Sequence, residues 1–490
     1  MAAKGTPFFV VDKSLWATQD ALSKGLAAMN QTLSQHTVDE LRARLRGPVV
    51  AACDAEYEDI RKIWNAAIEK RPALFARCIG NEEVIAALRF AGERDLEVAV
   101  RSGGHNVAGT ALTNGGLVID LQLMKRIDVD PERRKLRVQA GVRLADVDRA
   151  TEPYGLALVS GINSETGLAG LTLGGGIGWL MREYGLTIDY LVSAELVTVD
   201  GEVLRVSADR NPDLFWAIRG GGGNFGIVTS FEFDLVPVGP EVYGGIVLYA
   251  AEQARDVLRH YREWAATAPD EVTTILMLRR NAFPWTGPEL QGRAIVGIGA
   301  LYSGAADDGE AALAPLHQFG TVLASSVQKR SWTQHQSMID ASAPAGRLYY
   351  WKSHYLPGLS DTAIEVIADN AWQFSSPYSL TLLSHMGGAI RRHSEDETAF
   401  SGRDAEFTIN INCGATDPDA YQRDRSWVRR WFDALTPHST GGMYVNFISE
   451  DAGERVHEVY GVSKYARLSE LKARYDPRNV LRVNQNIKPA

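Results

Sequence analysis

Short apolar runs separated by turn residues are the main pattern of the chain between residues 96 and 238. Residues 96–100 and 116–121 have the pattern of buried strands, and a glycine-rich turn lies between them. Residues 196–206 predict a β-hairpin, in which Asp200 and Gly201 suit a two-residue type I′ turn. This part of the chain is therefore expected to consist mainly of strands and tight turns.

Beyond residue 237 the pattern changes, because longer strands alternate with amphipathic helices up to about residue 435. Helices are predicted over residues 251–267 and 361–374, and strands over residues 294–302 and 407–412. We expect this region to form an antiparallel sheet with helices on one face. The tail from residue 441 predicts one more strand and a helix over residues 464–474.

The first 44 residues are polar and predict a helical extension, with helices over residues 14–29 and 38–46. A chain of 490 residues is long for one hydrophobic core, so we expect two large lobes. No internal repeat is visible.

Composition narrows the possible partners. The chain has 51 Lys and Arg against 60 Asp and Glu, with both signs interspersed, so no basic run suits a nucleic acid. Its cysteines, Cys53, Cys78 and Cys413, form no CxxC pair, and we expect neither a zinc site nor a disulfide scaffold. No apolar stretch reaches the ~18 residues of a membrane span, and no leader pattern is visible. We therefore expect a cytoplasmic protein that acts without a metal or a membrane.

The turn at residues 101–106 has the sequence Arg-Ser-Gly-Gly-His-Asn and is the most informative segment. Paired glycines let the backbone approach a bulky ligand closely, and successive N–H groups in such a turn can bind a phosphate. His105 follows the glycines directly, so it is expected within reach of whatever the turn holds.

Two further glycine-rich segments lie at residues 161–179 and 219–228. Neither has the spacing of a dinucleotide-binding GxGxxG motif or of a P-loop. This disfavours a Rossmann fold that binds a nicotinamide cofactor and a P-loop that binds a nucleoside triphosphate. Glycines alone would also fit tight turns without a ligand. Three such segments together with His105 favour a backbone wrapped around an extended ligand with a pyrophosphate.

These segments, together with Tyr475-Asp476-Pro477 and Asn484-Gln485-Asn486-Ile487 in the tail, resemble the FAD-linked oxidases of the berberine-bridge-enzyme type in the vanillyl-alcohol oxidase superfamily. The resemblance extends from about residue 45 to the end and is greatest to the bacterial 6-hydroxy-D-nicotine oxidase branch. It implies an α+β, two-lobe FAD-binding fold with an antiparallel-sheet substrate domain. The FAD-binding domain would comprise residues 45–236 and 440–490, and the substrate-binding domain residues 237–439.

The resemblance also implies which residues bind FAD. They come from the three glycine-rich segments, the residues after the second segment, and the tail. The set comprises Arg101, Ser102, Gly103, Gly104, His105, Asn106, Asn163, Thr166, Gly167, Gly170, Gly174, Gly175, Gly176, Gly178, Tyr184, Gly223, Asn224, Gly226, Ile227, Val228, Asn484 and Asn486.

By the same resemblance, His105 is the covalent attachment point of the flavin. Many relatives have a second link from a cysteine, but Asn163 occupies that position here, so a single link is expected. Thr166 aligns with the residue that controls oxygen access to the flavin. Because threonine is small, an oxidase that reduces oxygen to hydrogen peroxide is favoured over a dehydrogenase.

The catalytic base is less clear from the sequence. Relatives often use the last tyrosine of a Tyr-x-Asn-Tyr strand, whereas this chain has Phe447 there, after Tyr444 and Asn446. Alternative candidates come from the substrate sheet, with His385 and Lys352 preferred. The others are Tyr350, Asn410 and Asn412 of that sheet, and Tyr444 of the tail strand itself.

Three functions follow as hypotheses. The first is an oxidase that takes a hydride from a CH–OH or CH–NH carbon of a small-molecule substrate to the flavin N5. The second is a flavin dehydrogenase with another electron acceptor, and the third is a flavin-bearing binding protein without turnover.

Overall fold

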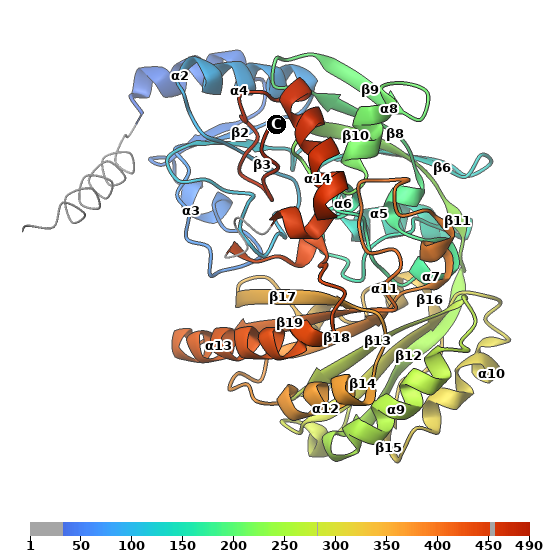
Figure 1. Ribbon diagram of the computed structural model, residues 1–490. Helices are drawn as coiled ribbons and strands as arrows, with labels where there is room; N and C mark the ends of the chain where they lie inside the picture. The colour runs from blue at the N-terminus through green and yellow to red at the C-terminus, as the bar shows by residue number, and fades with distance from the viewer. Residues whose placement is uncertain (1–32, 282, 451–455) are drawn as a thin grey trace, which may run out of the picture.

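A small parallel sheet, a five-stranded antiparallel sheet and a large antiparallel sheet organise the chain (Figure 1). The structure is a computed structural model that describes residues 33–281, 283–450 and 456–490. The helix expected over residues 14–29 lies outside the described residues. The second expected N-terminal helix is α2 (Gln35–Arg44).

The small sheet positions the His105 turn. Its strands β2 (Leu74–Arg77), β4 (Leu117–Asp120) and β3 (Val98–Arg101) are parallel, and β1 (Val49–Ala51) pairs antiparallel at one edge. These strands are almost wholly buried, which explains their continuous apolar runs. Helix α4 (Asn81–Glu93) connects β2 to β3. The glycine turn therefore starts at the carboxyl end of a buried strand.

The five-stranded sheet lies beside it and is antiparallel throughout. Its strand order is β5 (Ile127–Asp130), β6 (Lys135–Gln139), β10 (Ile227–Asp234), β8 (Leu191–Val197) and β9 (Val203–Ser207). The hairpin predicted over residues 196–206 is β8–β9, but its turn is not type I′. Only Gly201 has a positive φ, and the N–H of Gly201 donates to the carbonyl of Thr198, so the turn spans one more residue than predicted.

The large sheet confirms the antiparallel sheet predicted beyond residue 237. Its strands follow the order β15 (Val322–Ser325), β12 (Glu241–Ala250), β14 (Ile295–Tyr302), β13 (Val272–Arg279), β18 (Leu380–His385), β19 (Phe407–Ala415) and β17 (Leu348–Leu356), and β16 (Gln328–Ser331) pairs with β12. Helices α9 (Ala254–Ala265), α12 (Asp361–Asn370) and α13 (Pro418–Leu435) cover the face turned away from the small sheets (Figure 1). Part of the other face packs against α7 (Met181–Tyr184) and α11 (Trp332–Gln336), and the rest, the uncovered face, is available to line a site.

The tail returns to the first lobe through α14 (Val456–Tyr475), which is kinked at Gly461. The prediction of a strand near Tyr444 is wrong, because Val445–Phe447 forms the 3-10 turn η9. The N–H of Phe447 donates to the carbonyl of Tyr444, which closes this turn. Within the described residues, we find no helix with the length and apolar character needed to cross a membrane.

Candidate active site

A cavity of about 340 Å³ lies between the glycine-rich turns of the first lobe and the uncovered face of the large sheet. All three glycine-rich segments contribute to its wall, as do Tyr444–Phe447, Leu481 and Val483–Gln485 of the tail. Its lining is mostly apolar with a few polar groups, as is usual for small-molecule sites. The sequence segments singled out for chemistry therefore meet at one place.

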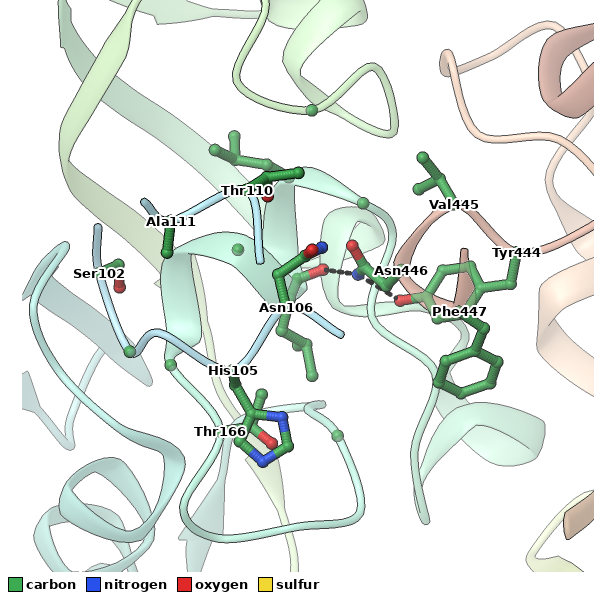
Figure 2. A pocket seen from close by; sticks show the side chains of 18 of the residues that line it. Ser102, His105, Asn106, Thr110, Ala111, Thr166, Tyr444, Val445, Asn446 and Phe447 are labelled. Carbon is green, nitrogen blue, oxygen red and sulfur yellow. Dashed lines mark hydrogen bonds between the residues drawn. The ribbon is translucent and has the colours of Figure 1, made fainter. Parts of the chain in front are cut away.

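His105 lies in the wall of this cavity, at the carboxyl end of β3 (Figure 2). Trp64 stacks on its ring, with the two ring centroids 4.3 Å apart. The Nε2 atom is buried and has no hydrogen-bond partner in the described part of the chain. Burial lowers the pKa of His105 to about 4, so the imidazole is neutral at ordinary pH. A neutral, unpartnered imidazole nitrogen is available to act as a nucleophile.

Two glycines bring the first and second glycine-rich segments into direct contact. A Cβ on Gly103 would lie 2.5 Å from the Cα of Gly167, so neither position has room for a side chain. Thr166 precedes Gly167, and both Thr166 and His105 line the cavity (Figure 2). This contact is consistent with the two segments approaching one ligand.

The glycines expected to bind the cofactor divide into two groups. Gly170 and Gly223 line the cavity, and a Cβ on either would meet no atom within 4 Å, so they leave open space beside the backbone. Gly175, Gly176 and Gly178 do not line the cavity. Their missing side chains admit Phe400, Thr187 and the carbonyl of Ser160, respectively. The close packing explains why these three positions are glycine, and their assignment as cofactor contacts stays a prediction.

Asn224 connects the third glycine-rich segment to the tail. Its Nδ2 donates to the carbonyls of Gly221 and Gln485, and its Oδ1 accepts from the N–H of Ile487. Asn484 lines the cavity and has a buried Oδ1 without a partner among the described residues. Asn486 does not line the cavity, contrary to expectation.

Of the remaining residues expected to bind FAD, most line the cavity and two do not. Those in the wall are Ser102, Gly104, Asn106, Asn163, Gly174, Gly226, Ile227 and Val228. Arg101 is 1% exposed and donates from Nη2 to Asp120 Oδ2 at 2.7 Å, so it holds strands β3 and β4 together. Tyr184 donates to the carbonyl of Pro237 at 3.4 Å, outside the lining. Both side chains therefore have structural partners and lie outside the cavity lining.

Tyr444 also lines the cavity, and its hydroxyl oxygen accepts two hydrogen bonds, of which Figure 2 shows the one from Asn446. The donors are the N–H of Gly176 at 3.0 Å and Asn446 Nδ2 at 2.9 Å. Burial raises the pKa of Tyr444, whereas these two donors favour the phenolate and oppose that rise. Phe447 borders the same space and offers no acid or base.

The uncovered face of the large sheet supplies the opposite wall. Tyr349 and Trp351 of β17 line the cavity together with Asn410 and Asn412 of β19. The Oδ1 atoms of both asparagines and the Nε1 of Trp351 are buried without partners in the described residues. These atoms could form hydrogen bonds to a bound molecule.

Three of the proposed catalytic residues lie on the wrong face of the sheet. Tyr350 and Lys352 point toward α13, where Arg429 Nε donates to Tyr350 Oη at 3.1 Å and Lys352 Nζ lies 4.8 Å from the Phe432 ring centroid. His385 is buried, and its Nε2 lies 3.0 Å from Arg182 Nη1 and from Glu406 Oε1. Because side chains alternate along a strand, their neighbours line the cavity instead. The preferred pair His385 and Lys352 is therefore corrected.

Several site residues escaped the sequence analysis. Trp64 lies in a region of short helices without a local motif, and only its stacking on His105 identifies it. Tyr349 and Trp351 flank Tyr350 in sequence, but alternation along the strand does not show which face is open. Arg279, at the end of β13, lines the cavity and carried no signal in the sequence.

The residues present fit an FAD. His105 offers a neutral nitrogen without a partner, Gly170 and Gly223 leave space for close approach of a ligand, and Asn484 has an unused acceptor. The rest of the lining is largely apolar, which suits a flat aromatic ring system.

Comparisons with known proteins agree with this site. A family model described as FAD binding domain matches residues 72–207, and one described as Berberine and berberine like matches residues 443–488. The chain is 31% identical over 457 residues to an FAD-linked oxidoreductase of Dictyostelium discoideum. The alignment covers 92% of this chain and 97% of that protein. The chain is also 30% identical over 464 residues to (R)-6-hydroxynicotine oxidase of Paenarthrobacter nicotinovorans, with 91% and 97% covered.

A solved structure shows the same architecture. The crystal structure of 6-hydroxy-D-nicotine oxidase from Arthrobacter nicotinovorans superposes with a TM-score of 0.81 and 29% identity, covering 91% of this chain and 98% of that one. The chain therefore belongs to the FAD-linked oxidoreductases of the berberine-bridge-enzyme type, with the two-lobe fold of the vanillyl-alcohol oxidase superfamily and FAD as its cofactor.

Proposed function

We propose that this enzyme is an oxidase that removes a hydride from a CH–OH or CH–NH carbon of a small molecule and uses oxygen as the electron acceptor. One observation carries the proposal: His105, Thr166 and the uncovered face of the large sheet line a single cavity. The flavin and a substrate held on the sheet would then share one space, with a small side chain at the position that governs oxygen access.

FAD, when bound, supplies the redox chemistry, since it accepts the hydride and passes the electrons on. The protein's part is to hold the flavin and orient the substrate. We propose that His105 carries a single covalent link to the flavin. Asn163 cannot form a second link, and none of the three cysteines lines the cavity.

The substrate proton needs an acceptor when the substrate is an alcohol. Within the described residues, the cavity lining contains no carboxylate and no lysine. We propose that Tyr444 takes this proton as its phenolate, a form that two N–H donors stabilise; because burial raises the pKa of Tyr444 overall, this step needs a pH at which the phenolate forms. A neutral amine substrate would need no base at this step. The relative named (R)-6-hydroxynicotine oxidase favours an amine, and a further relative, named xylooligosaccharide oxidase, of Thermothelomyces thermophilus favours an alcohol.

The proposal is tested by separating the two half-reactions of the holoenzyme. Secondary amines and sugars, with and without a carboxylate group, are mixed with it anaerobically, and bleaching of the flavin absorbance is followed. Oxygen is then added, and peroxide is quantified against reduced flavin. We expect one peroxide per flavin, with reoxidation faster than about 10⁴ M⁻¹s⁻¹, the low end of ordinary enzymatic rate constants. Slower reoxidation with rapid electron transfer to a quinone would make the protein a dehydrogenase, and a flavin that no substrate bleaches would indicate a binding protein.

A further inference from the structure

The cavity contains one conspicuous charge. Arg279, the last residue of β13, is the only Asp, Glu, Lys or Arg that lines it in the described part of the chain. It pairs with Leu380 of β18 and lies two residues after Met277, and both of these residues also line the cavity. Its side chain therefore belongs to the substrate wall of the site and not to the glycine-rich segments.

Arg279 is only partly satisfied by its neighbours. Its Nη1 donates to Ser342 Oγ at 2.7 Å, its Nε donates weakly to the carbonyl of Arg280 at 3.4 Å, and its guanidinium carbon lies 4.5 Å from the Phe283 ring centroid. Nη2 has no partner among residues 33–281, 283–450 and 456–490. No carboxylate in those residues forms an ion pair with Arg279. A guanidinium offers five N–H groups in a planar fork, so most of its donors remain available.

A second arginine adds to the positive charge. Arg347 donates from Nη1 to the carbonyl of the same Ser342 at 3.3 Å and lies 3.8 Å over the ring of Tyr378, which lines the cavity. It also lacks an ion pair with any described carboxylate. Burial, and secondarily the charge of Arg347, lower the pKa of Arg279 to about 10. The charge of Arg347 thus opposes that of Arg279, and an anion bound near both would relieve this repulsion.

We infer that the substrate of this enzyme carries a carboxylate or a similar oxyanion, which the Nη2 edge of Arg279 binds at the sheet wall of the cavity. A carboxylate matches the planar donor fork of arginine, and the low-dielectric surroundings strengthen the pair. The inference rests on the proposed function, because it assigns the anion to the substrate of that site. It narrows the substrate class to acids that also carry an oxidisable alcohol or amine carbon.

Small acids and their neutral counterparts test the inference on the holoenzyme. Benzoate and phenylacetate are titrated against the flavin absorbance, with benzamide and phenylacetamide as uncharged probes of similar shape. We expect the wild-type protein to bind each acid at least tenfold more tightly than its amide. In Arg279→Met, the affinity for the acids should fall at least tenfold, and the affinity for the amides should not change.

Arg280→Met is the matched control. Arg280 is adjacent and equally charged, but it does not line the cavity and donates to the carbonyl of Trp372 at 3.0 Å. The Arg280→Met variant should bind the acids as tightly as the wild-type protein does. Acids and amides that bind equally, probes that do not perturb the flavin at all, or unaltered acid binding in Arg279→Met would each overturn the inference.

The cofactor's own phosphate is the competing source of an anion. If Arg279→Met lost its FAD, the arginine would serve the cofactor, and the inference would be wrong. A wild-type protein that holds no FAD would refute the proposed function instead. Calorimetric titration with the same acids would then still decide whether Arg279 binds a carboxylate.

Discussion

His105 is the residue on which the account depends. Its neutral state follows from burial, since the imidazole would be protonated only below a pH of about 4. Its orientation follows from the Trp64 stack, and Trp64 in turn stacks on Tyr349 at a centroid distance of 3.8 Å. A strand of the substrate sheet thus supports the proposed attachment point of the cofactor.

Thr166 gives a prediction at the same scale. In Thr166→Leu, a larger side chain would fill part of the cavity beside the His105 turn and obstruct oxygen. We expect flavin reoxidation to slow by at least roughly tenfold, equivalent to about 1.4 kcal/mol of activation free energy, with anaerobic reduction changed little. Stopped-flow absorbance measures both steps, and Thr166→Ser, with a small side chain, should behave as wild type. Equal slowing of both half-reactions would argue against a role specific to oxygen.

Sequence reasoning succeeded at this scale where backbone contacts dictate the residue. Gly103 and Gly167 must be glycine because their backbones touch, and that requirement is visible as a motif. It failed where only alternation was available. A period of two places Tyr350 and Lys352 on one face, but it does not say whether that face meets the cavity or α13.

At the scale of elements, the last turn of α14 fixes the tail against the third glycine-rich segment. Lys472 and Asp476 are both fully buried, with Nζ and Oδ2 2.7 Å apart. Lys472 also donates to the carbonyls of Asn224 and Leu481, and Asp476 accepts from the N–H groups of Val480 and Leu481. This buried pair therefore connects the helix, the tail and a wall of the cavity.

Asp476→Ala would leave the Lys472 cation buried without its partner. We expect the free energy of unfolding to fall by about 3–5 kcal/mol, as measured by chemical denaturation of the holoenzyme. The exposed ion pair of Arg467 with Asp213 provides the control, and Asp213→Ala should cost at most about 1 kcal/mol. A small and equal effect of both substitutions would show that the buried pair does not hold the tail.

The element order was largely predictable, because amphipathic helices and apolar strands carry strong periodic signals. The tail was not, since Tyr444 and Asn446 are held by tertiary contacts with Gly176 and Leu171 that no local pattern encodes. These tertiary contacts explain why Val445–Phe447 forms the turn η9 and not the predicted strand.

At the scale of the whole molecule, the two lobes meet partly through α5 (Leu144–Thr151) and α11 (Trp332–Gln336). Trp332 Nε1 donates to Asp148 Oδ1 at 3.1 Å, and Asp148 Oδ2 is buried without a partner among the described residues. Burial raises the pKa of Asp148 to about 7, from an ordinary value near 4. The folded chain therefore binds this proton more tightly than the unfolded chain does.

The sign of the resulting pH dependence follows from linkage. Between pH 4 and 7 the unfolded chain releases the proton first, so the stability that Asp148 contributes is lost as the pH rises through this window. Asp148→Asn cannot ionise and keeps an oxygen for Trp332. We expect its melting temperature, relative to that of the wild type, to rise from pH 5 to about pH 7 and then to level off. Asp209→Asn, at an exposed position, should show no such trend, and a constant difference for Asp148→Asn would contradict the assignment.

The most direct test of the central claim is the intact mass of the denatured protein. We predict that the wild-type polypeptide carries the mass of exactly one FAD and that an acid precipitate stays yellow, whereas His105→Ala loses both properties. Asn163→Ala should retain the link, since we assign no covalent bond to that position. A wild-type mass equal to the bare polypeptide, or an FAD that stays attached in His105→Ala, would contradict the account.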